Sequence, residues 1–221
     1  MRFRNFLIRD LISPRKIKLI ATVKPYTMIT YPRLSELYEK VAFLETQNMQ
    51  GSFVELGVCN GGSAGIMASI SSHNLKRSIW LFDSWEGMPE PTEFDISSFG
   101  IQAQKGLAMG DEKKVRELLF KKLKLNDGKI HLVKGWFHET IPIYKRDIGK
   151  IALLHLDCDW YESVLFCLDE LYDSVVENGF VFIDDYGDWE GCKKAVDEFV
   201  EKRNLKIELT RVDRTGVYFQ K

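Results

Sequence analysis

The sequence predicts an α/β fold in which helices flank a mostly parallel sheet, and two observations predict it. From about residue 50 onward, short runs of apolar and β-branched residues alternate with longer segments of helical period. The chain has 221 residues, of which 45% are hydrophobic, so it can bury a substantial core. One domain is the simplest organisation.

Seven strands and four helices are expected in chain order. The predicted strands are 52–58, 78–84, 130–136, 151–157 and 180–186, with closing strands in 206–212 and 216–221. The predicted helices are 63–72, 111–123, 160–176 and 190–203. Several strands end in a polar or charged residue, and open α/β sheets bind ligands outside the carboxyl ends of their strands.

Two regions lie outside this alternation. Residues 1–50 are predicted to form a helical extension or lid before a main domain at 51–221. Residues 87–110 are too many for an ordinary connection, and long loops in compact domains are often lids or binding loops.

The charge balance argues against a general nucleic-acid binder, because 31 basic and 32 acidic residues give a net charge of −1. Residues 1–24 hold seven Lys or Arg and one Asp, a net charge of +6, whereas the remainder carries −7. This basic segment could contact a membrane surface, an acidic partner or the acidic body of its own fold.

No apolar run reaches the length of a membrane span, so a soluble, cytoplasmic protein is expected. The cysteines show no CxxC spacing, and reduced thiols are expected at Cys59, Cys158, Cys167 and Cys192. The N-terminal helices could pack between subunits of a homo-oligomer.

A glycine-rich turn, "ELGVCNGGSAG", follows a predicted strand and opens a predicted helix. Gly57, Gly61 and Gly62 allow a tight turn and close approach to a ligand, and Ser63 is expected to cap the helix. The turn lacks the GxGxxG pattern. Asp83 ends the next strand, where it can either accept hydrogen bonds from ribose hydroxyls or cap a helix. Together these elements predict a nucleoside cofactor.

Carboxylates gather at "HLDCDWYES" and "FIDDYGD". If the two strands are parallel neighbours, Asp157 meets Asp184 and Asp185 at one edge of the sheet. Three such carboxylates repel one another and raise one another's pKa, which a hard cation with oxygen ligands would relieve. The alternative is that one of the pair caps a helix and the other is solvated. Asp159 has capping-box spacing in "DWYE" and is expected to cap the following helix.

Histidines and aromatic residues give weaker signals. His155 lies in a predicted buried strand and is expected to be a satisfied core residue. His138 is a weaker candidate than Asp157 for a general base. Three aromatic residues at strand ends could face an adenine ring or a sulfonium cation, or could pack in the core: Trp85, Trp136 and Tyr161.

Five ordered motifs resemble the macrocin O-methyltransferase family, which comprises metal-dependent enzymes that use S-adenosylmethionine. The motifs are "FVELGVCNGGSA", "LFDSWEGMPEP", "KGWFHETIP", "HLDCDWYES" and "GFVFIDDYGDWEGCKKAVDEF". The resemblance extends from about Tyr26 to Phe199. It implies a three-layer, Rossmann-like class I methyltransferase fold with seven strands, of which the last is antiparallel.

The resemblance also implies roles for individual residues. Asp157, Asp184 and Asp185 match the family's magnesium ligands. Cofactor contacts are implied for Thr27, Glu55, Gly57, Gly61, Ser63, Asp83, Ser84, Gly135 and Trp136. The implied reaction is methyl transfer to one hydroxyl of a vicinal diol on a sugar or glycan, with both oxygens on the metal and Asp157 as the proton acceptor.

The family's acceptors are antibiotic sugars, and a glycan or lipid-linked saccharide is equally open. Two other functions remain as alternatives. A nicotinamide-dependent oxidoreductase should carry GxGxxG and has no use for the Asp184–Asp185 pair. A non-catalytic nucleoside-binding protein would share the cofactor motifs.

Overall fold

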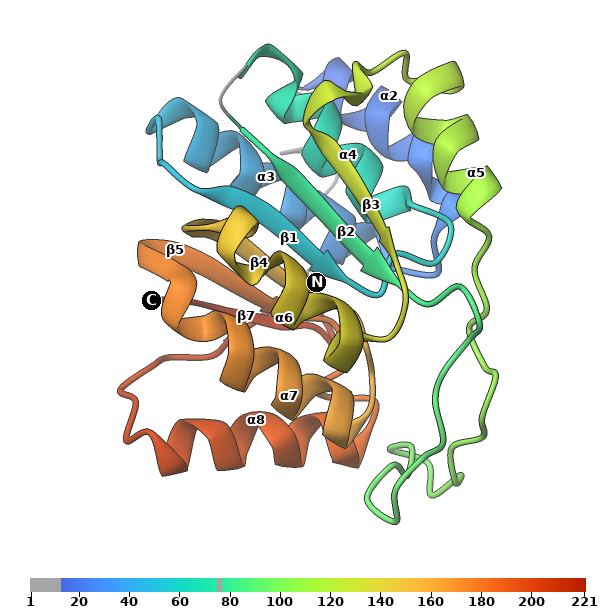
Figure 1. The fold of residues 1–221 in the computed structure, drawn as a ribbon, viewed down its shortest axis with the longest axis vertical. Coiled ribbons are helices and arrows are strands. Elements are labelled where there is room, and N and C mark those ends of the chain that lie inside the picture. Colours follow the sequence, from blue (N-terminus) through green and yellow to red (C-terminus); the bar gives the residue numbers. More distant parts are fainter. Residues whose placement is uncertain (1–12, 75–76) are drawn as a thin grey trace.

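Figure 1 shows the chain as a computed structural model that describes residues 13–74 and 77–221. The first half of the basic N-terminal segment therefore lies outside the described residues. In the part that is described, Lys16 is buried and donates a hydrogen bond to Glu39 at 2.7 Å.

A seven-stranded sheet in the order β3-β2-β1-β4-β5-β7-β6 forms the centre of the fold. All neighbouring pairs from β3 to β5 are parallel, and β7 runs antiparallel to both β5 and β6, as predicted. The strands are β1 (Ser52–Leu56), β2 (Ile79–Asp83), β3 (Ile130–Lys134), β4 (Ile151–Leu156), β5 (Val175–Ile183), β6 (Thr210–Arg211) and β7 (Val217–Gln220).

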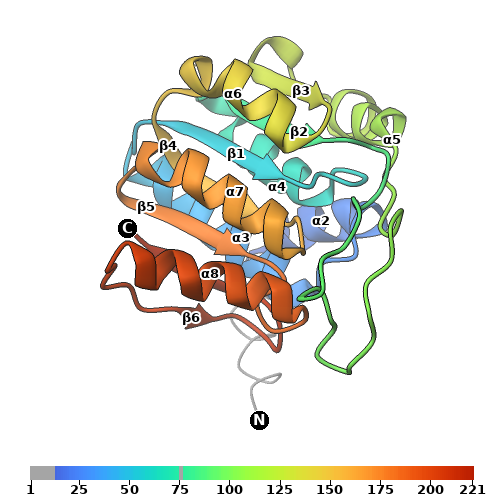
Figure 2. The ribbon, with the colours of Figure 1, turned by 60° about the horizontal axis from the view of Figure 1, so that its bottom comes forward.

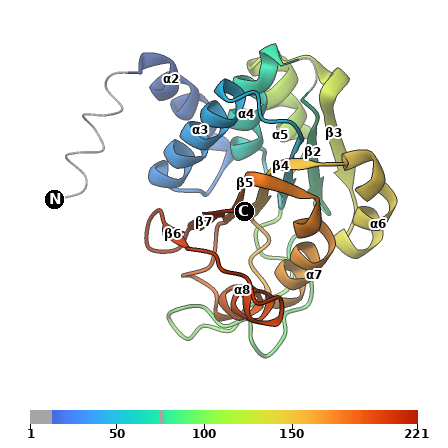
Figure 3. The same ribbon diagram turned by 90° about the vertical axis from the view of Figure 1, so that its left-hand side faces the viewer.

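Helices cover both faces of the sheet, which makes three layers (Figures 1 and 3). One face carries α2 (Pro14–Val23), α3 (Tyr31–Thr46) and α4 (Gly62–Ile70); the other carries α6 (Phe137–Ile148), α7 (Tyr161–Leu171) and α8 (Glu190–Lys202). Every residue of β1 and β4 is buried, as expected for strands covered on both sides. Helix α5 (Glu112–Arg116) continues as a π-helical turn at Glu117–Lys122, and single 3₁₀ turns occur at Lys24–Tyr26, Ser71–His73, Asp127–Lys129 and Tyr172–Ser174.

The N-terminal helices α2 and α3 share the core of α4. Ile20, Val23 and Leu34 are at most 1% exposed and belong to the same apolar cluster as the inner face of α4. The predicted extension therefore packs on the main domain. No helix among the described residues is long and apolar enough to cross a bilayer, and all four cysteines are free.

Several elements differ from the prediction. Helix α6 was not predicted, because Pro142 interrupts its helical pattern; burial of Ile141 and Ile148 nevertheless holds it against the sheet. Helix α7 ends at Leu171 and β5 already begins at Val175, so the predicted helix 160–176 is too long. The closing strands are shorter than predicted.

The long connection between β2 and α5 has no regular helix or strand, and it runs along the carboxyl ends of the strands (Figure 2). Two isolated β-bridges hold this loop. Ile96 pairs with Gln102 inside the loop, and Ser97 pairs with Trp189 just before α8. The loop is therefore held against the body at the edge where the site is expected.

Gly57 allows the backbone that follows β1 to lie close to the backbone of Asp157, which follows β4. Its φ is +93°, and a Cβ would lie 1.9 Å from the Asp157 carbonyl oxygen. Gly106 is a matched control, because its φ is +81° but a Cβ there would meet nothing within 4 Å.

We expect Gly106→Ala to lower the free energy of unfolding by about 1–2 kcal/mol, the cost of a left-handed residue. Gly57→Ala should cost about 2 kcal/mol more, because backbone must move to admit the methyl group. Urea denaturation of both variants measures the difference. Equal losses of free energy in the two variants would show that the close approach of β1 and β4 at Gly57 is not required for stability.

Candidate active site

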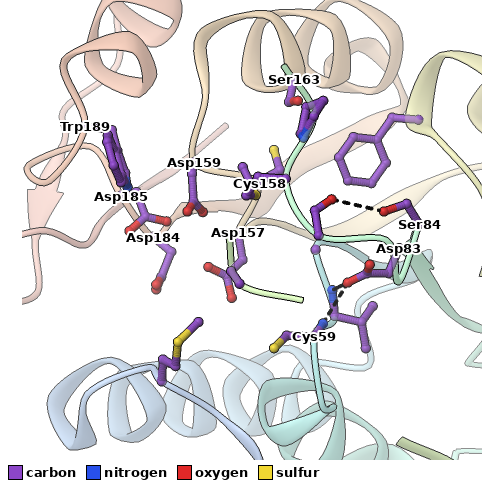
Figure 4. Close-up of a pocket in the computed structure, with 18 of the residues that line it drawn as sticks. Cys59, Asp83, Ser84, Asp157, Cys158, Asp159, Ser163, Asp184, Asp185 and Trp189 are labelled. Atoms are coloured by element: carbon purple, nitrogen blue, oxygen red, sulfur yellow. Dashed lines mark hydrogen bonds between the residues drawn. The ribbon is translucent and has the colours of Figure 1, made fainter. Parts of the chain in front are cut away.

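A cavity of about 300 Å³ opens at the carboxyl ends of the strands (Figure 4). Its walls come from the N-terminal segment 27–33, the glycine turn, the long loop and the residues that follow β2, β3, β4 and β5. Asp157, Asp159, Asp184 and Asp185 gather on one side, whereas Asp83 lies at the other end. The pocket thus has an acidic edge, formed by Asp157, Asp159, Asp184 and Asp185, and a turn of backbone amides at its other end.

Asp83 holds the glycine turn in place. Its Oδ2 accepts hydrogen bonds from the amides of Val58 at 2.8 Å and Cys59 at 2.7 Å, and its Oδ1 accepts one from Trp85 at 2.6 Å. Burial raises the pKa of Asp83, although these amides oppose the shift. A carboxylate has about four acceptor sites, so capacity for another donor remains.

Six of the predicted cofactor residues line the pocket: Thr27, Gly57, Asp83, Ser84, Gly135 and Trp136. Thr27 reaches this position because Gly62, at the start of α4, has no side chain; a Cβ there would lie 2.6 Å from Thr27 Cβ. The other three, Glu55, Gly61 and Ser63, do not belong to the lining of the pocket.

Glu55 and His155 form a buried pair beneath the pocket. The Glu55 side chain is fully buried, and its Oε1 lies 2.9 Å from His155 Nδ1. This confirms His155 as a satisfied core residue. Within the described chain, Glu55 Oε2 has no hydrogen-bond partner. Ser63 does not cap α4 as predicted: Gly61, at φ +90°, occupies the N-cap and Ser63 is buried in the helix.

The acidic edge forms because β4 and β5 are parallel neighbours. The Asp157 amide donates to Leu56 O at 2.9 Å, and the Asp184 amide donates to Leu156 O at 3.0 Å. One carboxylate oxygen from each of Asp157, Asp184 and Asp185 lies within 4.8 Å of the others. The predicted convergence of these three residues is confirmed.

These three carboxylates fit a divalent cation such as Mg²⁺. They offer only oxygen donors, which hard cations prefer. Burial first, and then repulsion from Asp184 and Asp185, raises the pKa of Asp157 well above its usual range. Burial and the neighbouring Asp159 and Asp184 likewise raise the pKa of Asp185. A bound cation would offset this concentration of negative charge.

Arg33 is a site residue that the sequence analysis missed. It lies on α3, and its guanidinium contacts the Asp184 carboxylate, the Asp184 carbonyl oxygen at 2.9 Å and Asp213 Oδ2 at 3.1 Å. Burial alone would lower the pKa of Arg33, but the charges of Asp184 and Asp213 raise it. The only sequence signal was a basic residue near Thr27, which does not indicate a partner 151 residues away.

Asp159 does not cap α7, contrary to the prediction. The N-cap is Trp160, and Asp159 has a left-handed φ of +56° that directs its carboxylate into the pocket. Burial, followed by repulsion from Asp184, raises the pKa of Asp159 to about 6. A fourth carboxylate therefore faces the acidic edge.

The remaining candidates have other surroundings. His138 lines a neighbouring cavity beside Trp160, separate from the acidic edge. Trp85 is buried and donates from Nε1 to Cys59 O at 3.0 Å, so it supports the glycine turn. Tyr161 donates to Glu198 at 2.6 Å, and Trp136 lines both cavities.

Comparison with known proteins explains this arrangement. The family model for macrocin O-methyltransferase (TylF) matches residues 20–221. The chain belongs to the macrocin O-methyltransferase family. It is therefore an S-adenosylmethionine-dependent O-methyltransferase, and the oxidoreductase and non-catalytic alternatives are wrong.

Relatives and a solved structure agree with this assignment. The demethyldecarbamoylnovobiocin O-methyltransferase of Streptomyces niveus is 33% identical over 201 residues, which are 89% of this chain and 76% of that enzyme. A tetracenomycin 4′-O-methyltransferase of Streptomyces olivaceus is 30% identical over 88% of this chain and 75% of its own length. The structure of the O-methyltransferase NovP has a TM-score of 0.79 and 33% identity, covering 89% of this chain and 82% of that one.

We expect Arg33→Met to lower the free energy of unfolding by about 3 kcal/mol, because it leaves two partly buried carboxylates without their cation. Added Mg²⁺ should restore part of this loss, since the metal then supplies the positive charge. Arg214→Met is the control: its ion pair with Asp188 is exposed and should contribute less than about 1 kcal/mol. Equal losses in the two variants would contradict the role of Arg33.

The raised pKa of Asp159 predicts how stability depends on pH without metal. The folded chain binds its proton up to about pH 6, whereas an ordinary aspartate releases it near 3.8, so this carboxyl destabilises the fold as pH rises through that window. In EDTA, Asp159→Asn should therefore become more stable than the parent between about pH 4 and 7, by on the order of 2 kcal/mol. Thermal melting at several pH values measures the gap, and a constant gap would contradict the prediction.

Proposed function

We propose that the chain transfers the methyl group of S-adenosylmethionine to a sugar hydroxyl, with Mg²⁺ held by Asp157, Asp184 and Asp185. The observation that carries this proposal is the set of three oxygen ligands within 4.8 Å of one another, on the wall of the pocket that the glycine turn also lines. A methyl donor and a cation would thus share one pocket.

The sugar acceptor is supported by what the relatives are named for. The Streptomyces olivaceus enzyme is named for the 4′ hydroxyl of a dimethoxy-rhamnosyl group. Its name places methoxy groups at positions 2 and 3, so the oxygen beside the reacting hydroxyl is an ether. We therefore propose a hydroxyl with a second oxygen on the adjacent carbon; the vicinal diol is one such arrangement, on a natural-product sugar or another glycan.

The cofactor would lie between the glycine turn and the ends of β2 and β3. We assign the ribose hydroxyls to Asp83, which retains acceptor capacity after its three backbone contacts. Gly135 and Trp136 would face the adenine, and Thr27 would cover the cofactor from the N-terminal segment. Glu55, Gly61 and Ser63 would support the methionine end from below without lining the cavity.

The acidic edge supplies the chemistry at the acceptor. A divalent cation held there would stabilise negative charge on the acceptor and lower the pKa of its hydroxyl. Asp157, as a ligand, is one candidate to receive the proton. Asp159 is better placed, because its carboxylate faces the pocket outside the ligand set.

Positioning of the two substrates would complete catalysis. Methyl transfer requires the acceptor oxygen, the methyl carbon and the sulfur to lie in line, and correct positioning can contribute several kcal/mol to lowering the barrier. In this chain, Met28 and residues of the long loop line the pocket, and Trp189 lies beside Asp185. These groups would exclude water from the transfer.

We expect Asp184→Ala to abolish metal binding and to reduce methyl transfer more than about a hundredfold, because three ligands become two. Its affinity for S-adenosylmethionine should stay close to that of the parent. Calorimetry with Mg²⁺ and with the cofactor measures both affinities. Transfer is assayed as release of S-adenosylhomocysteine, with demethyldecarbamoylnovobiocin and rhamnosides as acceptors.

Asp188→Asn is the matched control, since Asp188 lines the same side of the pocket but lies outside the ligand set. It should keep the parent's metal affinity. Full methyl transfer by Asp184→Ala would contradict the metal assignment, and loss of metal affinity in both variants would show that the ligand set is wrong.

Asp159→Asn should retain the metal and lose transfer.

A further inference from the structure

The long loop supplies the carboxylate that caps α7. The N-cap residue Trp160 makes no side-chain capping hydrogen bond. Instead, Asp95 Oδ1 accepts a hydrogen bond from the amide of Tyr161, the first residue of α7, at 2.8 Å. Asp95 lies 66 residues earlier and is 1% exposed. A buried carboxylate at the first turn of a helix satisfies a free amide and interacts favourably with the helix dipole.

Both oxygens of the Asp95 carboxylate accept hydrogen bonds. Its Oδ2 accepts hydrogen bonds from the amide of Thr92 at 2.7 Å and from the Thr92 hydroxyl at 2.8 Å. A Cβ at Gly191 would lie 2.0 Å from Asp95 Oδ1, so the start of α8 leaves room for this carboxylate. The loop therefore fits between the first turns of both helices.

The next loop residues continue the same contact along the acidic edge. Ile96 O accepts a hydrogen bond from the amide of Glu190, the first residue of α8, at 2.9 Å, and the Ser98 amide donates to Asp188 O at 2.6 Å. Both helices that begin beside the metal ligands thus have their first amides satisfied by the loop. The position of the loop and the position of the acidic edge depend on each other.

One capping position has two candidate carboxylates. Asp159, with Glu162 three residues later, has the local sequence of a cap, and capping would require it to adopt extended backbone and start the helix one residue earlier. It instead has the left-handed φ of +56° and faces the pocket. A left-handed aspartate costs about 1–2 kcal/mol and needs support from its surroundings.

We propose that Asp95 is a positioning residue for Asp159: by capping α7 from the loop, it frees Asp159 to face the acceptor. The catalytic consequence rests on the proposed function, in which Asp159 receives the proton. The replacement of Asp95 by Asp159 as the cap of α7 does not depend on the proposed function. When Asp95 is removed, Asp159 takes over the cap and its carboxylate leaves the pocket.

A thermal-melting cycle on the full chain tests this exchange. Asp95→Ala should lower the melting temperature by about 2–4 °C, the effect of a lost cap in a chain of this size. In the otherwise unchanged protein, Asp159→Ala should leave the melting temperature unchanged or raise it, because a carboxylate is removed from the acidic edge. In the Asp95→Ala background it should lower the melting temperature further, because Asp159 has become the cap.

An effect of Asp159→Ala that is the same in both backgrounds would overturn the proposal, since a merely structural Asp95 predicts no reversal of sign. Gly191→Ala gives a second route if Asp95→Ala does not fold, because its methyl group displaces the Asp95 carboxylate without removing it. The same reversal is expected there.

Two controls make the cycle specific. Asp95→Asn keeps an acceptor for the Tyr161 amide, so Asp159→Ala should behave in it as in the parent. Lys105→Met removes an exposed ion pair with Glu90 within the loop and should leave the effect of Asp159→Ala unchanged. Full methyl transfer by Asp159→Asn would contradict the proton-transfer assignment while leaving the stability reversal intact, so the two failures are distinguishable.

Discussion

The structure depends on holding four carboxylates together at one edge of the sheet. The parallel pairing of β4 and β5 places Asp157 beside Asp184 and Asp185, and Asp159 follows two residues later. Within the described residues, the positive side chain in contact with this edge is Arg33, which pairs with Asp184. One guanidinium does not neutralise four carboxylates, so the edge is suited to a divalent cation and would be unfavourable without one.

Two segments that line the pocket also contact the acidic edge or the helices that begin beside it. The N-terminal segment brings Thr27 over the start of α4 and Arg33 onto Asp184, so it touches both ends of the pocket. The long loop lines the outer wall and satisfies the first amides of α7 and α8 through Asp95 and Ile96. Elements distant in sequence thereby contact the same few carboxylates.

The chain belongs to the macrocin O-methyltransferase family, so this pocket is the candidate site of methyl transfer.

Local sequence patterns predicted the strands and the convergence of the three metal-binding candidates. Alternating apolar runs located the strands, and the rule that parallel strands share a carboxyl edge correctly brought Asp157 to Asp184 and Asp185. The prediction failed where a contact with a residue distant in sequence determines the local structure. Asp159 has the spacing of a cap, but Asp95 competes for the same amide from 66 residues away. Arg33 gave no signal because its partners lie on other elements. Helix α6 was missed because burial of Ile141 and Ile148 outweighs the effect of Pro142.

The proposed function requires Asp157, Asp184 and Asp185 to bind one divalent cation beside the methyl donor. Anomalous diffraction from crystals grown with Mn²⁺ and S-adenosylhomocysteine tests it most directly, because Mn²⁺ accepts the same oxygen ligands as Mg²⁺ and is visible at its absorption edge. We expect one anomalous peak within coordination distance of all three aspartates, with the cofactor's ribose on Asp83. Cofactor bound with no peak at this edge, or a peak held by other residues, would contradict it.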